Sequence, residues 1–261
     1  MLLVDPVIRS DYELMTDNAQ QSTNAHADRN TEIGILITKP RGYLVVKSAF
    51  LLGRVGSLNT RLVELTGAAA GDHVVDIGCG PGQLVRAFAD RVGSAGRVIG
   101  IDPSRAMIDY ATGRAATNCR FEVGAAQSLT LPDASVDVVT STFVMHHIPE
   151  EQRTAALGQM FRVLRPGGRL LLADTHPTGR VLPAAVRIMS RFAARRTDDP
   201  HSPGHHKDPL AAIDIRRYRE ALRAAGFGTV DFTTIPPTTG VLVATKDARV
   251  RSCPSMSSSA W

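Results

Sequence analysis

Between His73 and Asp174, short apolar segments alternate with longer amphipathic ones, and this alternation limits the possible folds most strongly. The apolar segments that we interpret as strands are His73–Ile77, Val98–Ile101, Arg120–Val123, Val136–Thr140 and Arg169–Ala173. The stretches between them carry apolar residues at helical spacing. Apolar strands that are separated by helices form a parallel sheet covered on both faces.

The segments outside this alternation extend the predicted fold. Val230–Ile235 and Val241–Thr245 read as two strands joined by a turn rich in proline and glycine, which predicts an antiparallel hairpin. Residues 44–65 have helical spacing and predict one or two helices that pack on the sheet or cover a ligand cleft. We therefore expect an α/β fold whose seven-stranded sheet is mostly parallel, with helices on both faces and a C-terminal antiparallel hairpin.

The first strand leads into a loop with glycines at alternate positions. Asp76 is followed by Gly78, Gly80 and Gly82, and a predicted helix begins directly afterwards. Glycines let the backbone turn sharply and let a ligand approach the loop amides, and the helix start offers free N–H groups. A dinucleotide fingerprint would place its third glycine one residue later. The spacing and the acid favour a ligand with an amino-acid end, whose ammonium Asp76 can hold.

The stretch Val74–Gln83 resembles the first motif of the class I S-adenosylmethionine-dependent methyltransferases. Four later stretches agree with that family in order and spacing: 98–102, 124–132, 138–149 and 164–174. The resemblance covers about Val63 to Lys246 and is strongest to the ubiquinone and menaquinone C-methyltransferases and related small-molecule O- and C-methyltransferases. It implies a Rossmann-like fold, S-adenosyl-L-methionine as cofactor and a small-molecule methyl acceptor, such as a lipid, quinone or polyketide.

The resemblance also implies a set of cofactor-binding residues: Asp76, Gly78, Gly80, Gly82, Asp102, Met107, Ala125, Ala126 and Thr142. Asp102 lies roughly 20 residues past the glycine loop, where such folds hold the ribose hydroxyls. Met107 would pack on the adenine ring, or serve equally as a core methionine. Ala125 replaces an Asp that commonly receives the adenine amino group, although the amide of Ala126 can still serve the ring.

Histidines after the fourth and fifth predicted strands are the candidates for catalysis. His146 and His147 follow the fourth strand, and either could be the general base for an acceptor that must lose a proton. The alternative is that one packs against the next helix and the other lines the cofactor pocket. His176 is a second candidate. The HxxxHH pattern of 201–206 lacks a convincing acidic or thiol partner, so we expect no metal.

The flanks and an insert complete the predicted domain organisation. We expect a partly disordered N-terminal arm over 1–40, a methyltransferase domain over 41–246 and a disordered tail over 247–261. The insert over about 178–209 has one apolar helical face and many arginines. It suits a lid over a lipophilic acceptor or peripheral contact with anionic lipid; a helix packed on the domain with solvated arginines is the alternative.

Composition narrows the classes of partner and compartment. The net charge of +5 is spread along the chain without a long basic block, and aromatic residues make up only 5% of the sequence, which disfavours nucleic acid as a partner. No Asn-Pro-Pro-Tyr run follows the fourth strand, which disfavours DNA bases and protein glutamines as acceptors. Three widely spaced cysteines and the lack of a leader-like apolar run favour a cytoplasmic protein with reduced thiols.

Three alternatives to an active small-molecule methyltransferase stay open. An NAD(P)-dependent oxidoreductase would need the later third glycine and a Tyr-x-x-x-Lys or similar dyad, and we identify no such dyad. A pseudoenzyme or regulatory protein that binds the cofactor without transferring a methyl group is compatible with Ala125 and with the unsettled base. An RNA-methylating enzyme is favoured by the positive charge, but no appended RNA-binding module supports it. The acceptor and the oligomeric state are left open.

Overall fold

The fold was obtained as a computed structural model, which describes residues 39–176, 214–236 and 238–248. Nearly all of the predicted arm over 1–40, the predicted insert over 178–209, the histidine pattern of 201–206 and the tail beyond 248 lie outside the described residues. Within the described ranges, no helix is both long and apolar enough to cross a membrane.

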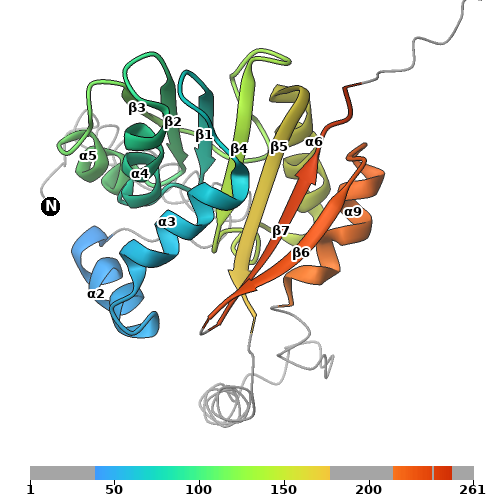
Figure 1. The fold of residues 1–261 in the computed structure, drawn as a ribbon. Helices are drawn as coiled ribbons and strands as arrows, with labels where there is room; N and C mark the ends of the chain where they lie inside the picture. Colours follow the sequence, from blue (N-terminus) through green and yellow to red (C-terminus); the bar gives the residue numbers. More distant parts are fainter. Residues whose placement is uncertain (1–38, 177–213, 237, 249–261) are drawn as a thin grey trace, which may run out of the picture.

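One seven-stranded sheet forms the centre of the structure, in the order β3-β2-β1-β4-β5-β7-β6 (Figure 1). Its strands are β1 (His73–Ile77), β2 (Arg97–Asp102), β3 (Cys119–Val123), β4 (Val136–Thr142), β5 (Leu164–Thr175), β6 (Val230–Ile235) and β7 (Thr239–Thr245). The first five strands are parallel, whereas β7 runs antiparallel to both β5 and β6. The predicted fold class is confirmed.

Helices cover both faces of this sheet (Figure 1). They are α2 (Pro40–Phe50), α3 (Val55–Thr66), α4 (Gln83–Val92), α5 (Arg105–Thr112), α6 (Arg153–Val163) and α9 (Tyr218–Ala224), with 3-10 turns η1 (Glu150–Gln152) and η2 (Ile215–Arg217). Side chains of α3 and α4 share one hydrophobic cluster with alternate residues of the strands, and side chains of α6 and α9 share the other. Because side chains alternate along β1, Val74 belongs to the cluster of α3 and α4, whereas Val75 and Ile77 belong to the cluster of α6 and α9.

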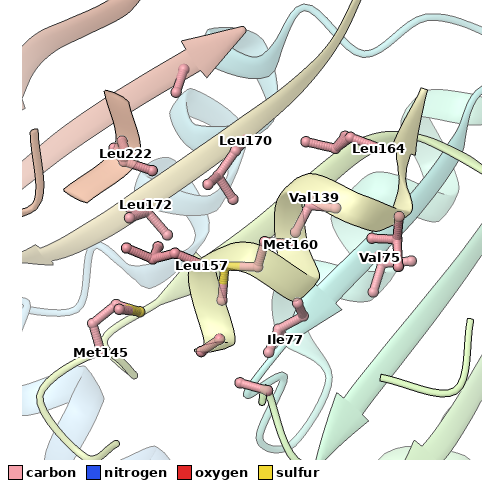
Figure 2. Packing of buried hydrophobic residues seen from close by; sticks show 14 of the residues in the cluster. Val75, Ile77, Val139, Met145, Leu157, Met160, Leu164, Leu170, Leu172 and Leu222 are labelled. Atoms are coloured by element: carbon pink, nitrogen blue, oxygen red, sulfur yellow. The ribbon is translucent and has the colours of Figure 1, made fainter. Parts of the chain in front are cut away.

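Helix α6 packs its apolar face onto the centre of the sheet. Leu157 and Met160 are fully buried against side chains of β1, β4 and β5, among them Val139 and Leu172 (Figure 2). Burial of each such side chain contributes about 1.5–3 kcal/mol. This packing makes the middle of the sheet a rigid support for the loops that follow β1 and β4.

Strand β5 begins earlier than the predicted strand at Arg169. The residues 166–168, which we expected to end the helix and precede the strand, lie inside β5. The chain becomes extended at Leu164, which pairs with Val136, and the register between β4 and β5 then shifts. The guanidinium of Arg165 donates to both carboxylate oxygens of Asp137, at 2.8 and 2.9 Å, and so ties this irregular start to β4.

The strand order places a crevice at one edge of the sheet. β1 lies between β2 and β4, so the connections from β1 and from β4 leave toward opposite sides. In open α/β sheets, ligands bind outside the carboxyl ends of the strands at such a switch point. The loops after β1, β2 and β4 are therefore where a site is expected.

Candidate active site

A cleft lies at the carboxyl ends of β1, β2 and β4. Its lining residues are Tyr43, Ile77, Gly78, Gly80, Asp102, Pro103, Met107, Gly124, Ala125, Ala126, Gln127, Thr142, Phe143, Val144, His147 and Ile148. Every predicted cofactor residue except Asp76 and Gly82 is on this list, and so is His147 but not His146. The structure thus brings together residues that are far apart in the chain. Asp76, Gly82 and His146 were also predicted, but they lie outside the lining of the cleft.

The glycine loop is held tightly against the neighbouring strands. The amides of Gly78 and Cys79 both donate to the carbonyl of Ile101, at 2.7 and 3.0 Å. Gly78 has a φ of +72°, and a Cβ there would lie 2.2 Å from Cγ2 of Val144. Only glycine suits this position, because both the backbone angle and the space exclude a side chain.

The other two loop glycines have different surroundings. Gly80 also has a positive φ, of +52°, and its Cβ position faces the cleft, with the Tyr43 ring 3.8 Å away. A ligand can therefore approach the backbone here. Gly82 directly precedes α4 as its N-cap, and a Cβ on it would lie 2.8 Å from the Phe121 ring. Gly82 thus allows α4 to pack closely on β3, and its contribution to a ligand site is indirect.

Asp102 ends β2 with its carboxylate fixed by two amides. Oδ2 accepts from the Gly80 amide at 2.9 Å, and Oδ1 accepts from the Ser104 amide at 2.8 Å. Burial raises the pKa of Asp102, and the two amide hydrogen bonds oppose that shift. Since a carboxylate has about four lone-pair positions, each oxygen keeps one for hydroxyl groups in the cleft. The ribose contact of Asp102 stays a prediction, and it would use these free acceptor positions.

Asp76 lies just before the glycine loop and is 2% exposed. Its Oδ1 accepts a hydrogen bond of 2.7 Å from the hydroxyl of Thr140 on β4. Burial raises its pKa to about 7, while the Thr140 hydrogen bond and the charge of Lys47 act in the opposite direction. Any influence of Asp76 on a bound ligand is therefore exerted from behind the cleft wall.

Helix α2 supplies two residues that sequence reasoning missed. The Tyr43 ring lines the cleft, and the ammonium of Lys47 lies 5.7 Å from the centre of that ring and 5.6 Å from the centre of the Phe143 ring. Their spacing is the Tyr-x-x-x-Lys pattern that an oxidoreductase would need, so the expectation that the chain has no such dyad was wrong. However, burial and the charges of Asp102 and Asp76 raise the pKa of Tyr43 to about 12, which opposes a role in donating protons.

Phe143 has an unusual backbone conformation directly after β4. Its φ is +59°, a left-handed value that costs a bulky residue conformational energy. The amide of Phe143 donates to the carbonyl of Ala173 at 2.7 Å and helps to hold this turn. The turn carries its side chain into the cleft wall and under the Lys47 ammonium.

The two adjacent histidines have different environments. Nδ1 of His146 lies 2.8 Å from Oδ2 of Asp174, which is 3% exposed at the end of β5. The ring of His147 lies 4.1 Å from that of His146 and lines the cleft. Burial and the neighbouring His146 lower the pKa of His147, so its ring is neutral at neutral pH. Asp174 was not predicted as a site residue, because only the fold brings it to His146.

His176 lies away from the cleft, after the end of β5. Its Nδ1 is 3.5 Å from Oδ1 of Asp214, and its ring packs edge-on against Phe232 at 5.3 Å between centres. His176 is not among the residues that line the cleft. Of the three histidines that we considered as bases, it therefore has the weakest geometric claim.

Comparisons with known proteins show similarity to methyltransferases. A family model described as a methyltransferase domain matches residues 74–168. The ubiquinone/menaquinone biosynthesis C-methyltransferase UbiE of Stutzerimonas stutzeri is 30% identical over 194 residues, which are 70% of this chain and 74% of that protein. The 27-O-demethylrifamycin SV methyltransferase of Amycolatopsis mediterranei is 39% identical over 192 residues, which are 71% of this chain and 64% of that protein.

Other matches are shorter or concern the fold. Alignments with three further curated relatives cover between 34% and 50% of those proteins, so the chain spans half of their length or less. A crystal structure of a SAM dependent methyltransferase from Aquifex aeolicus superposes with a TM-score of 0.56 at 20% identity, over 72% of this chain and 89% of that chain. At that identity the likeness supports the fold alone.

Proposed function

This chain belongs to the class I S-adenosylmethionine-dependent methyltransferases, in the group of the ubiquinone/menaquinone C-methyltransferase UbiE, and from that premise we propose that it methylates an oxygen or carbon atom of a small molecule. The observation that carries the proposal is the His146–Asp174 pair beside the cleft, at 2.8 Å between Nδ1 and Oδ2. An O–H or acidic C–H acceptor must lose its proton during methylation, and this pair is built to take one.

The cleft fits the cofactor of this family. The Gly80 backbone is open to a ligand, the Asp102 carboxylate has free acceptor positions for ribose hydroxyls, and Met107 offers an apolar surface for an adenine ring. Ala125 cannot accept from the adenine amino group, which costs one hydrogen bond of about 0.5–1.5 kcal/mol. When bound, S-adenosylmethionine supplies a methyl group already activated on a sulfonium.

His146 is the better candidate for the general base. Asp174 accepts from Nδ1–H of His146, and its other oxygen accepts from the Thr175 amide at 2.7 Å, so the carboxylate is fixed. Nε2 of His146 then carries the free lone pair. When the methyl group is transferred, the acceptor proton passes to Nε2, and the Asp174 carboxylate stabilises the imidazolium that forms.

His147 has a different role in this proposal. Its ring lines the cleft and stays neutral, and its Nδ1 is buried without a hydrogen-bond partner among the described residues. We assign it to the wall between the cofactor and the acceptor. The His146 side chain is 35% exposed next to that ring, so an acceptor can approach it.

The acceptor class follows from this chemistry and from the relatives. The two relatives whose alignments cover about 70% of this chain are named as a ubiquinone/menaquinone biosynthesis C-methyltransferase and as a 27-O-demethylrifamycin SV methyltransferase. A phenol or enol would suit both kinds of transfer, because removal of its proton makes both the oxygen and the ortho or α carbon nucleophilic. We propose a lipophilic phenolic or enolic acceptor, which suits the apolar side chains of Phe143, Val144 and Ile148 in the cleft wall.

The test compares wild-type protein with His146→Gln and His147→Gln in a methyl-transfer assay with labelled S-adenosylmethionine and a panel of hydroxylated quinols, phenols and enolic polyketides. We expect His146→Gln to lower kcat about 10²–10⁴-fold and to abolish the acid limb of the pH–rate profile, with cofactor affinity unchanged. His147→Gln should keep the acid limb. Full activity of His146→Gln, with the acid limb intact, would contradict the assignment.

A further inference from the structure

Lys47 and Asp76 carry opposite charges and lie near the part of the cleft that Gly78 and Phe143 line, but they do not form an ion pair. Lys47 on α2 and Asp76 at the end of β1 act on each other electrostatically, each opposing the pKa shift that burial imposes on the other. Within the part of the chain that the structure describes, neither has an ion-pair partner within 4.0 Å. Charged groups are rarely buried unless they are paired.

The position of the Lys47 ammonium is set by two rings of the cleft wall. It lies 5.7 Å from the centre of the Tyr43 ring and 5.6 Å from the centre of the Phe143 ring, and both rings line the cleft. The rings attract the ammonium only weakly, and among the described residues no hydrogen bond from the Lys47 ammonium accompanies these ring contacts. An anion at this end of the cleft would therefore be the missing partner.

Asp76 has the complementary arrangement. One of its oxygens accepts from the Thr140 hydroxyl at 2.7 Å, and Asp76 lies two residues before Gly78, which lines the cleft together with Phe143. Asp76 therefore exerts a negative charge through the glycine loop, whereas Lys47 exerts a positive charge from α2. This part of the cleft matches the zwitterion of an α-amino acid, whose two charged groups are bonded to the same carbon atom.

We propose that Lys47 binds the α-carboxylate of the cofactor's amino-acid end, whose α-ammonium Asp76 attracts from behind the glycine loop, as expected from the sequence. The inference rests on the proposed function, because it requires a ligand with an α-amino-acid group. A charge-assisted hydrogen bond from an ammonium to a carboxylate is among the strong ones, so Lys47 contributes a large share of the affinity for the amino-acid end. In this proposal, helix α2 forms part of the cofactor site together with the glycine loop.

An alternative role for Lys47, as a competitor of the cofactor's ammonium, predicts a different effect on binding. If the Lys47 ammonium occupied the place of the cofactor's own ammonium, it would compete for Asp76, and its removal would strengthen binding. The proposed role predicts that its removal weakens binding, and only for ligands that carry the carboxylate. The sign of the change and its dependence on the ligand therefore separate the two roles.

The experiment titrates the full chain in a calorimeter with S-adenosylmethionine and with its decarboxylated form, which differ only in the carboxylate. Wild type should prefer S-adenosylmethionine. Lys47→Met should weaken its binding by on the order of tenfold or more and leave the decarboxylated ligand unchanged or bound more tightly. Lys39→Met, at the exposed start of the same helix, should leave both affinities unchanged.

Other outcomes of these titrations would contradict either the inference or the proposed function. Equal affinity of the wild type for the two ligands, an equal loss for both ligands in Lys47→Met, or tighter binding of S-adenosylmethionine by that variant would overturn the inference. Lys47→Gln keeps a polar end on the side chain and should show the same split, so the test survives if Lys47→Met does not fold. Wild type that binds neither ligand would instead refute the proposed function.

Discussion

Replacing Asp76 by Asn tests the electrostatics of the glycine loop through protein stability. Asn cannot ionise, but its side-chain oxygen can still accept the 2.7 Å hydrogen bond from Thr140. Burial raises the pKa of Asp76 to about 7 from an ordinary 3.8, so the folded state holds this proton more tightly than the unfolded state. Its contribution to stability is therefore fully present below about pH 4 and is lost as pH rises to about 7.

The size of the effect follows from the shift. A difference of about three pKa units corresponds to on the order of 4 kcal/mol. Relative to wild type, the unfolding free energy of Asp76→Asn should therefore rise by up to that amount between pH 4 and pH 8. Charges that titrate equally in both proteins cancel in this difference.

Urea denaturation of both proteins without cofactor, at several pH values across this range, measures the difference. Asp109→Asn is the matched control, because the Asp109 side chain is 69% exposed on α5, and its stability profile should run parallel to wild type. If the profile of Asp76→Asn also ran parallel to wild type, the Asp76 carboxylate would not be desolvated in the folded protein, and the reasoning would be refuted.

Two further variants test the cleft. Asp102→Ala should weaken binding of S-adenosylhomocysteine about ten- to hundredfold, as for the loss of hydrogen bonds to a charged group; calorimetry measures this with Asp109→Ala as control, and unchanged affinity would remove Asp102 from the site. Gly78→Ala should lower the unfolding free energy by more than the roughly 1–3 kcal/mol of a strained φ, because its Cβ would also meet Val144 at 2.2 Å. Gly93→Ala, with a φ of +66° but open space, isolates the backbone cost; equal losses in the two variants would show that the space around Gly78 is not restrictive.

The parts of the fold and site that the sequence predicted are those with local causes. Apolar segments alternating with amphipathic ones are enough to predict the parallel sheet. The glycine spacing marks a turn that only glycines can make, and Asp102 follows from the end of the next strand. These features depend on neighbours in the chain, and so they can be recognised before any tertiary contact is known.

The residues that were missed depend on contacts between distant segments. Asp174 reaches His146 across 28 positions of sequence, through the pairing of β4 with β5. Lys47 lies on a helix before the first strand, and nothing in its own surroundings shows that α2 packs over the glycine loop. The early start of β5 has the same origin, because Leu164 leaves the helix to pair with Val136.

Calorimetric titration of the full chain with S-adenosylmethionine and, separately, with NADH tests the central claim most directly. The glycine spacing, the free acceptor positions of Asp102 and the raised pKa of Tyr43 all favour the first ligand. We expect micromolar binding of S-adenosylmethionine and no binding of NADH. Binding of NADH alone would contradict the assignment and would favour an oxidoreductase that uses Tyr43 and Lys47.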